Sequence, residues 1–223
     1  DLDLQGVELQ DTTLVNPPIP DIVSTQTFSA ITALDVSKSS DYWAASTNHG
    51  DVMVWSGLTL HRAWRAHRDM TWALKFSRDG RFLATGGWDC IVKVWDVATG
   101  ALLWAGKHAA QVNGVAFSPD GRFLASSSSD ATVALWDAES GTHLQTLSHP
   151  VAVTGCTLDW SPDGSLLVSG DRDGTIRLWK FSEIGTTHCV QTLSGHSTFV
   201  DVLAFSPDGL RLASASFDGT VKL

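Results

Sequence analysis

Apolar and polar residues alternate along most of this chain in short runs, which is the two-residue period of a half-buried β-strand. A run that includes Val115 and Phe117 is followed by Ser-Pro-Asp-Gly, where proline and glycine suit the two central positions of a tight turn. The chain then continues as Leu-Ala-Ser, turns again at an aspartate, and alternates through Val-x-Leu-Trp. Segments 143–149 and 189–196 supply a further strand between successive copies, and no window has helical periodicity. The pattern predicts an antiparallel meander.

This meander recurs about every 40 residues. The copies begin at Phe76, Phe117, Trp160 and Phe205, and a weaker copy begins at Val36. The tryptophans that close the first four copies are 40, 41 and 43 residues apart, and they are Trp55, Trp95, Trp136 and Trp179. A fixed period of this length is typical of an architecture in which each repeat is one structural unit.

Four short strands per repeat, with a tryptophan and a preceding aspartate at fixed places, resemble a blade of the WD-repeat β-propeller family. The resemblance covers about residues 24–223 and implies an all-β fold of four-stranded antiparallel blades. The sequence accounts for about five blades, the fifth of which stops before its tryptophan. A complete ring in this family usually has seven, or ~290 residues at ~42 per blade, so we expect the remaining blades from a longer parent chain.

Four of the five repeats also carry a polar set. A hydroxyl lies ten residues before the closing tryptophan, an aspartate six before it, and a histidine 28 to 30 before it. The successive sets are His67, Thr85, Asp89 and Trp95; His108, Ser126, Asp130 and Trp136; His149, Ser169, Asp173 and Trp179; and, without a tryptophan, His196, Ser214 and Asp218. Serine, histidine and aspartate together could form a hydrolase triad, but a catalytic site needs one constellation in one cleft and this set recurs in four repeats. The resemblance implies a structural tetrad instead, in which indole, hydroxyl, imidazole and carboxylate form a hydrogen-bonded chain.

The first repeat departs from this pattern. Ala45 stands where the hydroxyl should be and His49 where the aspartate should be, so that only Trp55 remains. We therefore expect its blade to be held by packing without the polar network.

Composition limits the possible partners and compartments. The chain is 43% hydrophobic and 17% charged, which is the balance of a soluble globular protein. No stretch approaches the ~18 apolar residues that span a bilayer. The formal charge of −9 disfavours nucleic acid, which binds to clustered cations. The three cysteines are odd in number, far apart and without a Cys-x-x-Cys motif, so we expect a reducing, cytoplasmic location without a disulfide framework, a metal or a cofactor.

The acidic lead-in, residues 1–23, has a fainter period. Leu4, Leu9, Leu14 and Ile19 are spaced by five residues. This spacing resembles the end of a pentapeptide repeat, and the alternative is a disordered acidic linker. Residues 24–29 align with the outer strand of a blade and are expected to close the ring. A lead-in of this kind before a degenerate first blade resembles the C-terminal propeller region of bacterial multidomain signalling proteins with an NB-ARC or NACHT-type ATPase, or with a protease-like effector.

No nucleotide-binding loop, nucleophile elbow or zinc-protease motif is found, so enzyme chemistry has no support in the sequence. Propellers of this family commonly bind partners on the upper face, where the second turns and the starts of the first strands converge. The residues predicted there are Met70, Trp72, Trp88, Gln111, Asn113, Arg172, Phe199, Asp201 and Phe217. Aromatic residues and arginine favour interface centres, although some of these side chains could simply pack on their neighbours, Trp72 above all.

The sequence therefore predicts a non-catalytic scaffold or sensor that binds a protein or peptide. One alternative is a propeller enzyme or small-molecule binder with Asn113, Arg172 and Asp201 at the channel mouth. Another is a structural module with a permanent partner.

Overall fold

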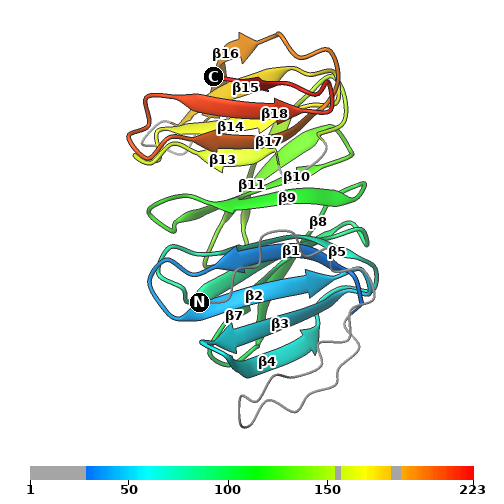
Figure 1. Ribbon diagram of the computed structural model, residues 1–223, viewed down its shortest axis with the longest axis vertical. Helices are drawn as coiled ribbons and strands as arrows, with labels where there is room; N and C mark the ends of the chain where they lie inside the picture. The colour runs from blue at the N-terminus through cyan, green and yellow to red at the C-terminus, as the bar shows by residue number, and fades with distance from the viewer. Residues whose placement is uncertain (1–28, 154–156, 182–186) are drawn as a thin grey trace.

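The computed structural model describes residues 29–153, 157–181 and 187–223. The strands in these residues form five antiparallel sheets, which we number as blades 1 to 5, and the described residues contain no helix. This confirms the predicted all-β propeller with five blades (Figure 1). The acidic lead-in and nearly all of the expected ring-closing strand lie outside the described residues, and the number of blades in a complete ring stays a prediction.

Each blade is a meander whose strands pair in chain order. Blade 1 comprises β1 (Ile31–Val36), β2 (Tyr42–Thr47), β3 (Asp51–Ser56) and β4 (Thr59–Arg65). Blade 2 comprises β5 (Thr71–Phe76), β6 (Phe82–Gly87), β7 (Ile91–Asp96) and β8 (Leu102–Lys107). Blade 3 comprises β9 (Val112–Phe117), β10 (Phe123–Ser128), β11 (Thr132–Asp137) and β12 (His143–Ser148). Blade 4 comprises β13 (Leu158–Trp160), β14 (Leu166–Gly170), β15 (Ile176–Phe181) and β16 (Thr187–Leu193). Blade 5 has the three strands β17 (Val200–Phe205), β18 (Leu212–Ser216) and β19 (Val221–Lys222).

The first turn of each meander is fixed by its own side chains. In blade 3 the Ser118 hydroxyl donates to Asp120 Oδ1 at 2.5 Å, and the Arg122 amide donates to the same oxygen at 3.1 Å. Gly121 lies between them with φ +73°, a backbone conformation that glycine adopts without steric cost. The predicted Ser-Pro-Asp-Gly turn therefore reverses the chain at the lower end of the blade.

The hydrophobic core lies between blades. Neighbouring sheets meet through their first strands, so that β1 lies beside β5, β5 beside β9, β9 beside β13 and β13 beside β17. The cluster between blades 2 and 3 is built from both sheets and includes Val92, Val94, Trp104, Val115, Leu124 and Trp136. Since each sheet buries apolar residues on both faces, the alternation in sequence marks which neighbouring blade a side chain contacts.

The two end blades expose the apolar side chains that inner blades bury. Val133 of blade 3 is 0% exposed, whereas Val221, which holds the same position in blade 5, is 71% exposed. At the other end, Leu34 and Val36 on β1 are exposed as well. Each end of this five-blade stack therefore presents an apolar sheet face.

Candidate interaction site

The polar sets of blades 2 and 3 have the same geometry. In blade 2, His67 Nδ1 lies 2.8 Å from Asp89 Oδ1 and His67 Nε2 lies 2.8 Å from Thr85 Oγ1, to which the Trp95 indole N–H donates at 3.0 Å. In blade 3 the equivalent distances, for His108 with Asp130, His108 with Ser126 and Trp136 with Ser126, are 3.1, 2.8 and 2.8 Å. Each set of hydrogen bonds links the loop before a blade to the second turn and the third strand of that blade.

The protonation pattern follows from this geometry. Burial alone would raise the pKa of Asp89, but the hydrogen bond and charge of His67, together with the Arg68 and Ile91 amides, lower the pKa below its usual value. Burial lowers the pKa of His108 against the opposing effect of Asp130. A neutral imidazole with its proton on Nδ1 donates to the carboxylate and accepts the hydroxyl proton at Nε2. The hydroxyl oxygen is then left to accept the indole N–H.

The prediction for blade 4 was wrong in one member, because Asp171 takes the place assigned to Asp173. The Asp171 carboxylate lies 3.5 Å from His149 Nδ1, accepts a hydrogen bond of 2.5 Å from Arg177 Nη1, and has 2% side-chain exposure. Asp173 takes part through its backbone amide, which donates to Asp171 Oδ1 at 3.1 Å. Asp171 lies 22 residues after the blade's histidine, and the aspartates of the other three sets lie 22 residues after theirs. Counting forward from the histidine would have identified it.

Arg177 also changes the tautomer of this set. Its Nη1 lies 2.9 Å from His149 Nδ1, and a guanidinium can only donate, so Nδ1 must be unprotonated. The proton is then on Nε2, which lies 2.8 Å from Ser169 Oγ. Burial, followed by the charge of Arg177, lowers the pKa of His149 to about 4. The predicted order of donors therefore does not apply to blade 4.

Blades 1 and 5 hold incomplete sets. In blade 5, His196 lies 2.9 Å from both Asp218 and Ser214. In blade 1 the remaining Trp55 stacks on Trp43 with ring centroids 4.0 Å apart, a packing contact in place of a polar network. The histidine side chains of the four sets are at most 2% exposed, which gives a substrate no access to them.

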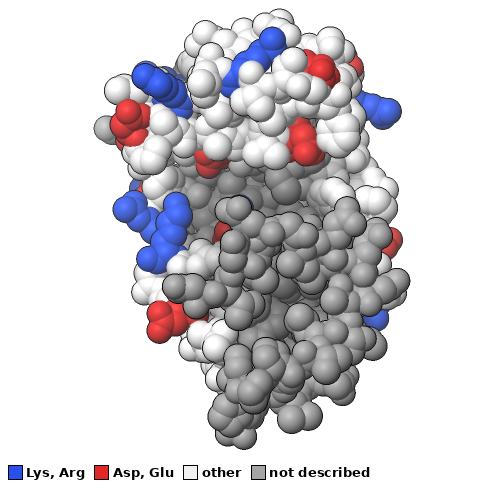
Figure 2. Space-filling view, in the orientation of Figure 1, with Lys and Arg blue, Asp and Glu red and all other residues white. Residues whose placement is uncertain are grey.

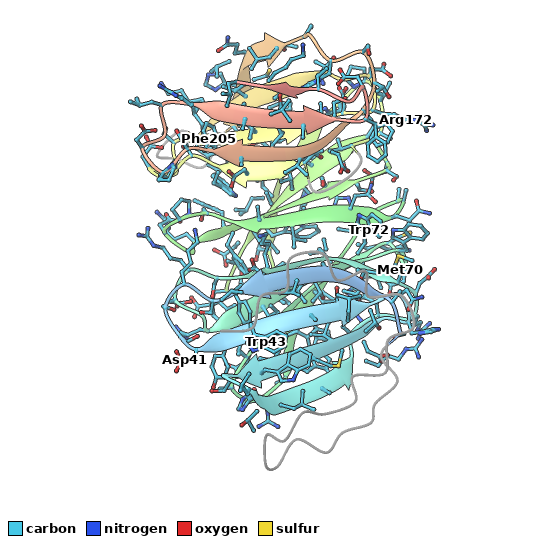
Figure 3. All side chains as sticks on the ribbon, in the orientation of Figure 1. Asp41, Trp43, Met70, Trp72, Arg172 and Phe205 are labelled. Carbon is cyan, nitrogen blue, oxygen red and sulfur yellow. The ribbon has the colours of Figure 1, made fainter. Side chains whose placement is uncertain are left out.

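The upper face is ordered by a hydrogen bond that recurs in every blade. The amide of the residue before the turn aspartate, or at the equivalent place, donates to a carbonyl in the loop that leads to the first strand. The pairs are Asn48 with Ala30, Trp88 with Met70, Ser129 with Gln111, Arg172 with Ala152, and Phe217 with Phe199, at 2.9 to 3.2 Å. In Figure 3, Met70, Trp72 and Arg172 lie at one end of the strands, while Asp41 and Phe205 lie at the opposite end.

Two aromatic pairs lie on the upper face. Trp72 and Trp88 are tilted against each other at 5.7 Å, and Phe199 and Phe217 are stacked at 4.0 Å. Trp72 and Phe199 are half-buried, whereas Trp88 is 39% and Phe217 is 65% exposed. Each pair is therefore an aromatic group anchored by its inner ring, with its outer ring presented to solvent.

A β-bulge at the start of each well-paired first strand aims one side chain upward or across to the next blade. The bulge residues are Thr32, Trp72, Asn113 and Asp201. Asn113 is 7% exposed and its amide nitrogen donates to Ser129 and to the Val153 carbonyl, both at 2.8 Å. Thr32, which the sequence did not single out, likewise donates to the Thr71 carbonyl of the next blade. Asn113 therefore holds blades together, and placing it among the partner-binding residues was wrong.

The other predicted positions are open or half-open. Gln111 and Arg172 are exposed, and Met70 and Asp201 are half-buried. A cavity of about 480 Å³ lies between the first turns of blades 2 and 3, at the opposite end of the strands from this face. Neither it nor a second cavity between blades 4 and 5 is lined by Asn113, Arg172 or Asp201. The described residues contain no group of three or more potential metal ligands, and they include no helix that is long and apolar enough to cross a membrane.

Comparison with known proteins agrees with this geometry. The family model described as "WD domain, G-beta repeat" matches residues 58–96, 104–137, 141–180 and 187–223, together more than half of the chain. A protein of Arabidopsis thaliana described as "U3 snoRNP-associated protein-like EMB2271" is 37% identical over 67 residues, which is 26% of this chain and 14% of that protein.

Among solved structures, a chain of the "Crystal Structure of Mitotic Checkpoint Complex" superposes with a TM-score of 0.76 at 25% identity. The match covers 84% of this chain and 60% of that chain. This chain thus spans less than two thirds of the length of both relatives. The repeated tetrads, the five meanders and these matches establish that the chain belongs to the WD40 repeat family and folds as a β-propeller.

Proposed function

We propose that this propeller is a non-catalytic platform that binds a protein or peptide on its upper face. The observation that carries the proposal is the pair of exposed rings, Trp88 and Phe217, which hold equivalent positions of two blades and pack on a second ring, Trp72 or Phe199. The exposed Arg172 holds the same position on blade 4. Exposed aromatic rings and arginine bury large areas at little entropic cost, which is why they dominate interface centres. One partner could contact three blades from this face.

A protein partner also suits the charge of the molecule. The chain carries a net charge of −9, and Figure 2 shows basic and acidic side chains interspersed over the described part of one face. Polyanions bind to continuous basic surfaces. The relatives support the same class of function, since one was solved as part of a protein complex and the other is described as associated with a ribonucleoprotein.

The proposal extends to the cellular setting. We place the propeller in the cytoplasm, within a larger bacterial signalling protein that carries an ATPase or protease-like effector. The support is the resemblance of residues 1–23 and of the degenerate first repeat to such proteins. A nucleotide-binding loop encoded upstream in the same gene would support this setting, and a gene without any effector domain would contradict it.

The binding surface is tested by separating fold from recognition. Peptides selected from a display library against the 223-residue chain are titrated against Trp88→Ala, Phe217→Ala and Arg172→Ala, with Ser129→Ala as the matched control at the equivalent position of blade 3. Loss of a central anchor should weaken binding about thirtyfold or more without a change in melting temperature. The control should bind normally. A lower melting temperature with unchanged binding in all three variants would show that these side chains only pack.

A permanent structural partner is the nearest alternative. It would use the same face but would not exchange, so a competitor peptide added after complex formation should displace a signalling partner within minutes and leave a permanent partner in place.

A further inference from the structure

The first turns of neighbouring blades touch at three of the four junctions between the described blades. Pro119 Cδ of blade 3 lies 3.6 Å from where a Cβ on Gly164 of blade 4 would be. Pro162 Cδ of blade 4 lies 3.3 Å from the same point on Gly209 of blade 5, and serine hydroxyls of the blade 1 turn lie 2.6 to 3.1 Å from the equivalent point in blade 2. In blade 3 this point belongs to Gly121, and no described atom beyond its chain neighbours lies within 4 Å of it. The first turns of blades 2 and 3 therefore stand apart.

A change in sequence accounts for this gap. Arg78 stands at the turn position that Pro119 and Pro162 hold in blades 3 and 4. The proline ring of one turn covers the glycine of the next, whereas the exposed Arg78 side chain leaves Gly121 open. The opening is the cavity of about 480 Å³ between these turns, within the ~300–1,000 Å³ that is usual for small-molecule sites. Its walls include Arg78, Arg81, Phe82, Pro119, Arg122 and Asp137.

The three arginines of the walls have free donors. Arg78, Arg81 and Arg122 are exposed, and none of their guanidinium groups forms an ion pair or donates a hydrogen bond to another described residue. Arg81 Cζ lies 5.0 Å from the centre of the Phe82 ring and Arg122 Cζ lies 5.3 Å from that of Phe123, contacts that orient both groups. Figure 2 shows Lys and Arg side chains gathered at the edge of the molecule where the turn after β9 lies in Figure 1. Each guanidinium offers five N–H donors to an anion.

The carboxylates of the walls are only half engaged. Asp79, Asp120 and Asp137 each accept, through Oδ1, a hydrogen bond from a serine hydroxyl two or three residues away, at 2.5 to 2.8 Å. Their Oδ2 atoms accept none from the other described residues. The hydrogen bonds from the amide and hydroxyl of Ser140 lower the pKa of Asp137, so this carboxylate is ionised at neutral pH. Glu139 is the fourth carboxylate and is exposed. The cavity therefore presents free acceptors beside free donors.

This combination favours one class of ligand. Inorganic phosphate would pair with the arginines but would leave the nearby carboxylates without a donor, and three guanidinium groups would repel a metal cation. A ligand with a phosphate at one end and hydroxyl groups at the other satisfies both sets of wall residues, through charge-assisted hydrogen bonds.

We propose that this cavity is a binding site for a sugar phosphate, with the phosphate between the three arginines and the hydroxyl groups on the Oδ2 atoms of the three aspartates. The site lies at the opposite end of the strands from the upper face, so this proposal and the proposed peptide-binding function can fail separately.

The test is isothermal titration calorimetry of the 223-residue chain with glucose 6-phosphate, fructose 6-phosphate and ribose 5-phosphate. At least one of these should bind with a dissociation constant of about 1 mM or tighter. Glucose and inorganic phosphate, each of which has only half of the recognised groups, should bind at least about tenfold more weakly than the best sugar phosphate. A phosphoserine peptide should also be at least about tenfold weaker, because it lacks the hydroxyl groups.

Arg78→Pro is the sharpest variant, because it gives blade 2 the turn of blades 3 and 4. The Arg78 amide donates no backbone hydrogen bond within the described residues, so proline removes none. The variant should lose at least about tenfold in affinity for the sugar phosphate and keep its melting temperature. Arg122→Ser, which copies Ser165 of blade 4, should weaken binding in the same way. Arg211→Ser is the matched control in the first turn of blade 5, outside the cavity, and should bind normally.

Four results would overturn the proposal. They are the absence of saturable binding by all three sugar phosphates, equally tight binding of inorganic phosphate, unchanged affinity in both Arg78→Pro and Arg122→Ser, and tighter binding of the phosphoserine peptide than of any sugar phosphate. The last result would assign the cavity to a phosphorylated protein instead.

Discussion

Asp171 and Asp173 are two residues apart, and the structure predicts opposite consequences for their removal. The Asp171 carboxylate is buried and accepts hydrogen bonds from Arg177 and from the amides of Asp173 and Thr175, both at 3.1 Å. The Asp173 side chain forms no hydrogen bond or ion pair with the other described residues. The comparison of Asp171→Ala with Asp173→Ala therefore isolates the contribution of the carboxylate that completes the blade 4 set.

The magnitude follows from what Asp171→Ala leaves behind. The Arg177 guanidinium, whose side chain is 15% exposed, loses its counter-ion, and two backbone amides lose their acceptor. Removal of one partner of a buried ion pair typically costs about 3–5 kcal/mol. For a chain of this size, a loss of that order lowers the melting temperature by about 10 °C. Asp173→Ala should change the free energy of unfolding by less than about 0.5 kcal/mol, because it removes no buried contact.

Urea denaturation and calorimetry of both variants measure these differences. A third variant, Asp171→Ala with Arg177→Met, should recover part of the lost stability, because it removes the uncompensated charge. If Asp173→Ala were the more destabilising of the two single substitutions, the spacing from the tryptophan would be the correct guide and the geometry described for blade 4 would be wrong.

Three further outcomes are expected. The pKa of His149 is about 4 in the folded chain against 6.5 for an unperturbed histidine, so the unfolded state binds more protons at pH values between the two. The free energy of unfolding should therefore fall by about 3 kcal/mol as the pH drops from 7 to 4, and an imidazole NMR titration with a midpoint near 6.5 would contradict this. Asn113→Ala should cost about 1–3 kcal/mol in urea denaturation, because the Val153 carbonyl loses its donor, and should leave peptide binding unchanged once the protein is folded. Cys90 has φ +69°, a backbone conformation that strains every residue except glycine. Cys90→Gly should therefore raise the melting temperature by a few degrees, and a lower melting temperature would count against strain at this turn.

Local pattern was sufficient for the architecture of this protein. Strand alternation, Ser-Pro-Asp-Gly turns and the 40-residue period are encoded by neighbouring residues, and repetition made each copy a check on the others. The polar sets of blades 2, 3 and 5 could also be predicted residue by residue, because their sequence spacings are equal and their turns have equal lengths. The degenerate first set was also visible, since Ala45 cannot donate or accept with its side chain.

The tertiary structure decided the contacts that depend on the fold of a single turn or on the packing of neighbouring blades. Whether Asp171 or Asp173 reaches His149 depends on the fold of one turn and on the charge of Arg177, which the sequence presents only as a neighbour of Trp179. The sequence predicts that Asn113 is an exposed residue at the start of a strand, and only the bulge turns its amide toward Val153 of the next blade. Strand order is set by hydrogen bonds and side-chain alternation within one repeat, whereas a site shared by two blades depends on how sheets 40 residues apart in sequence pack together.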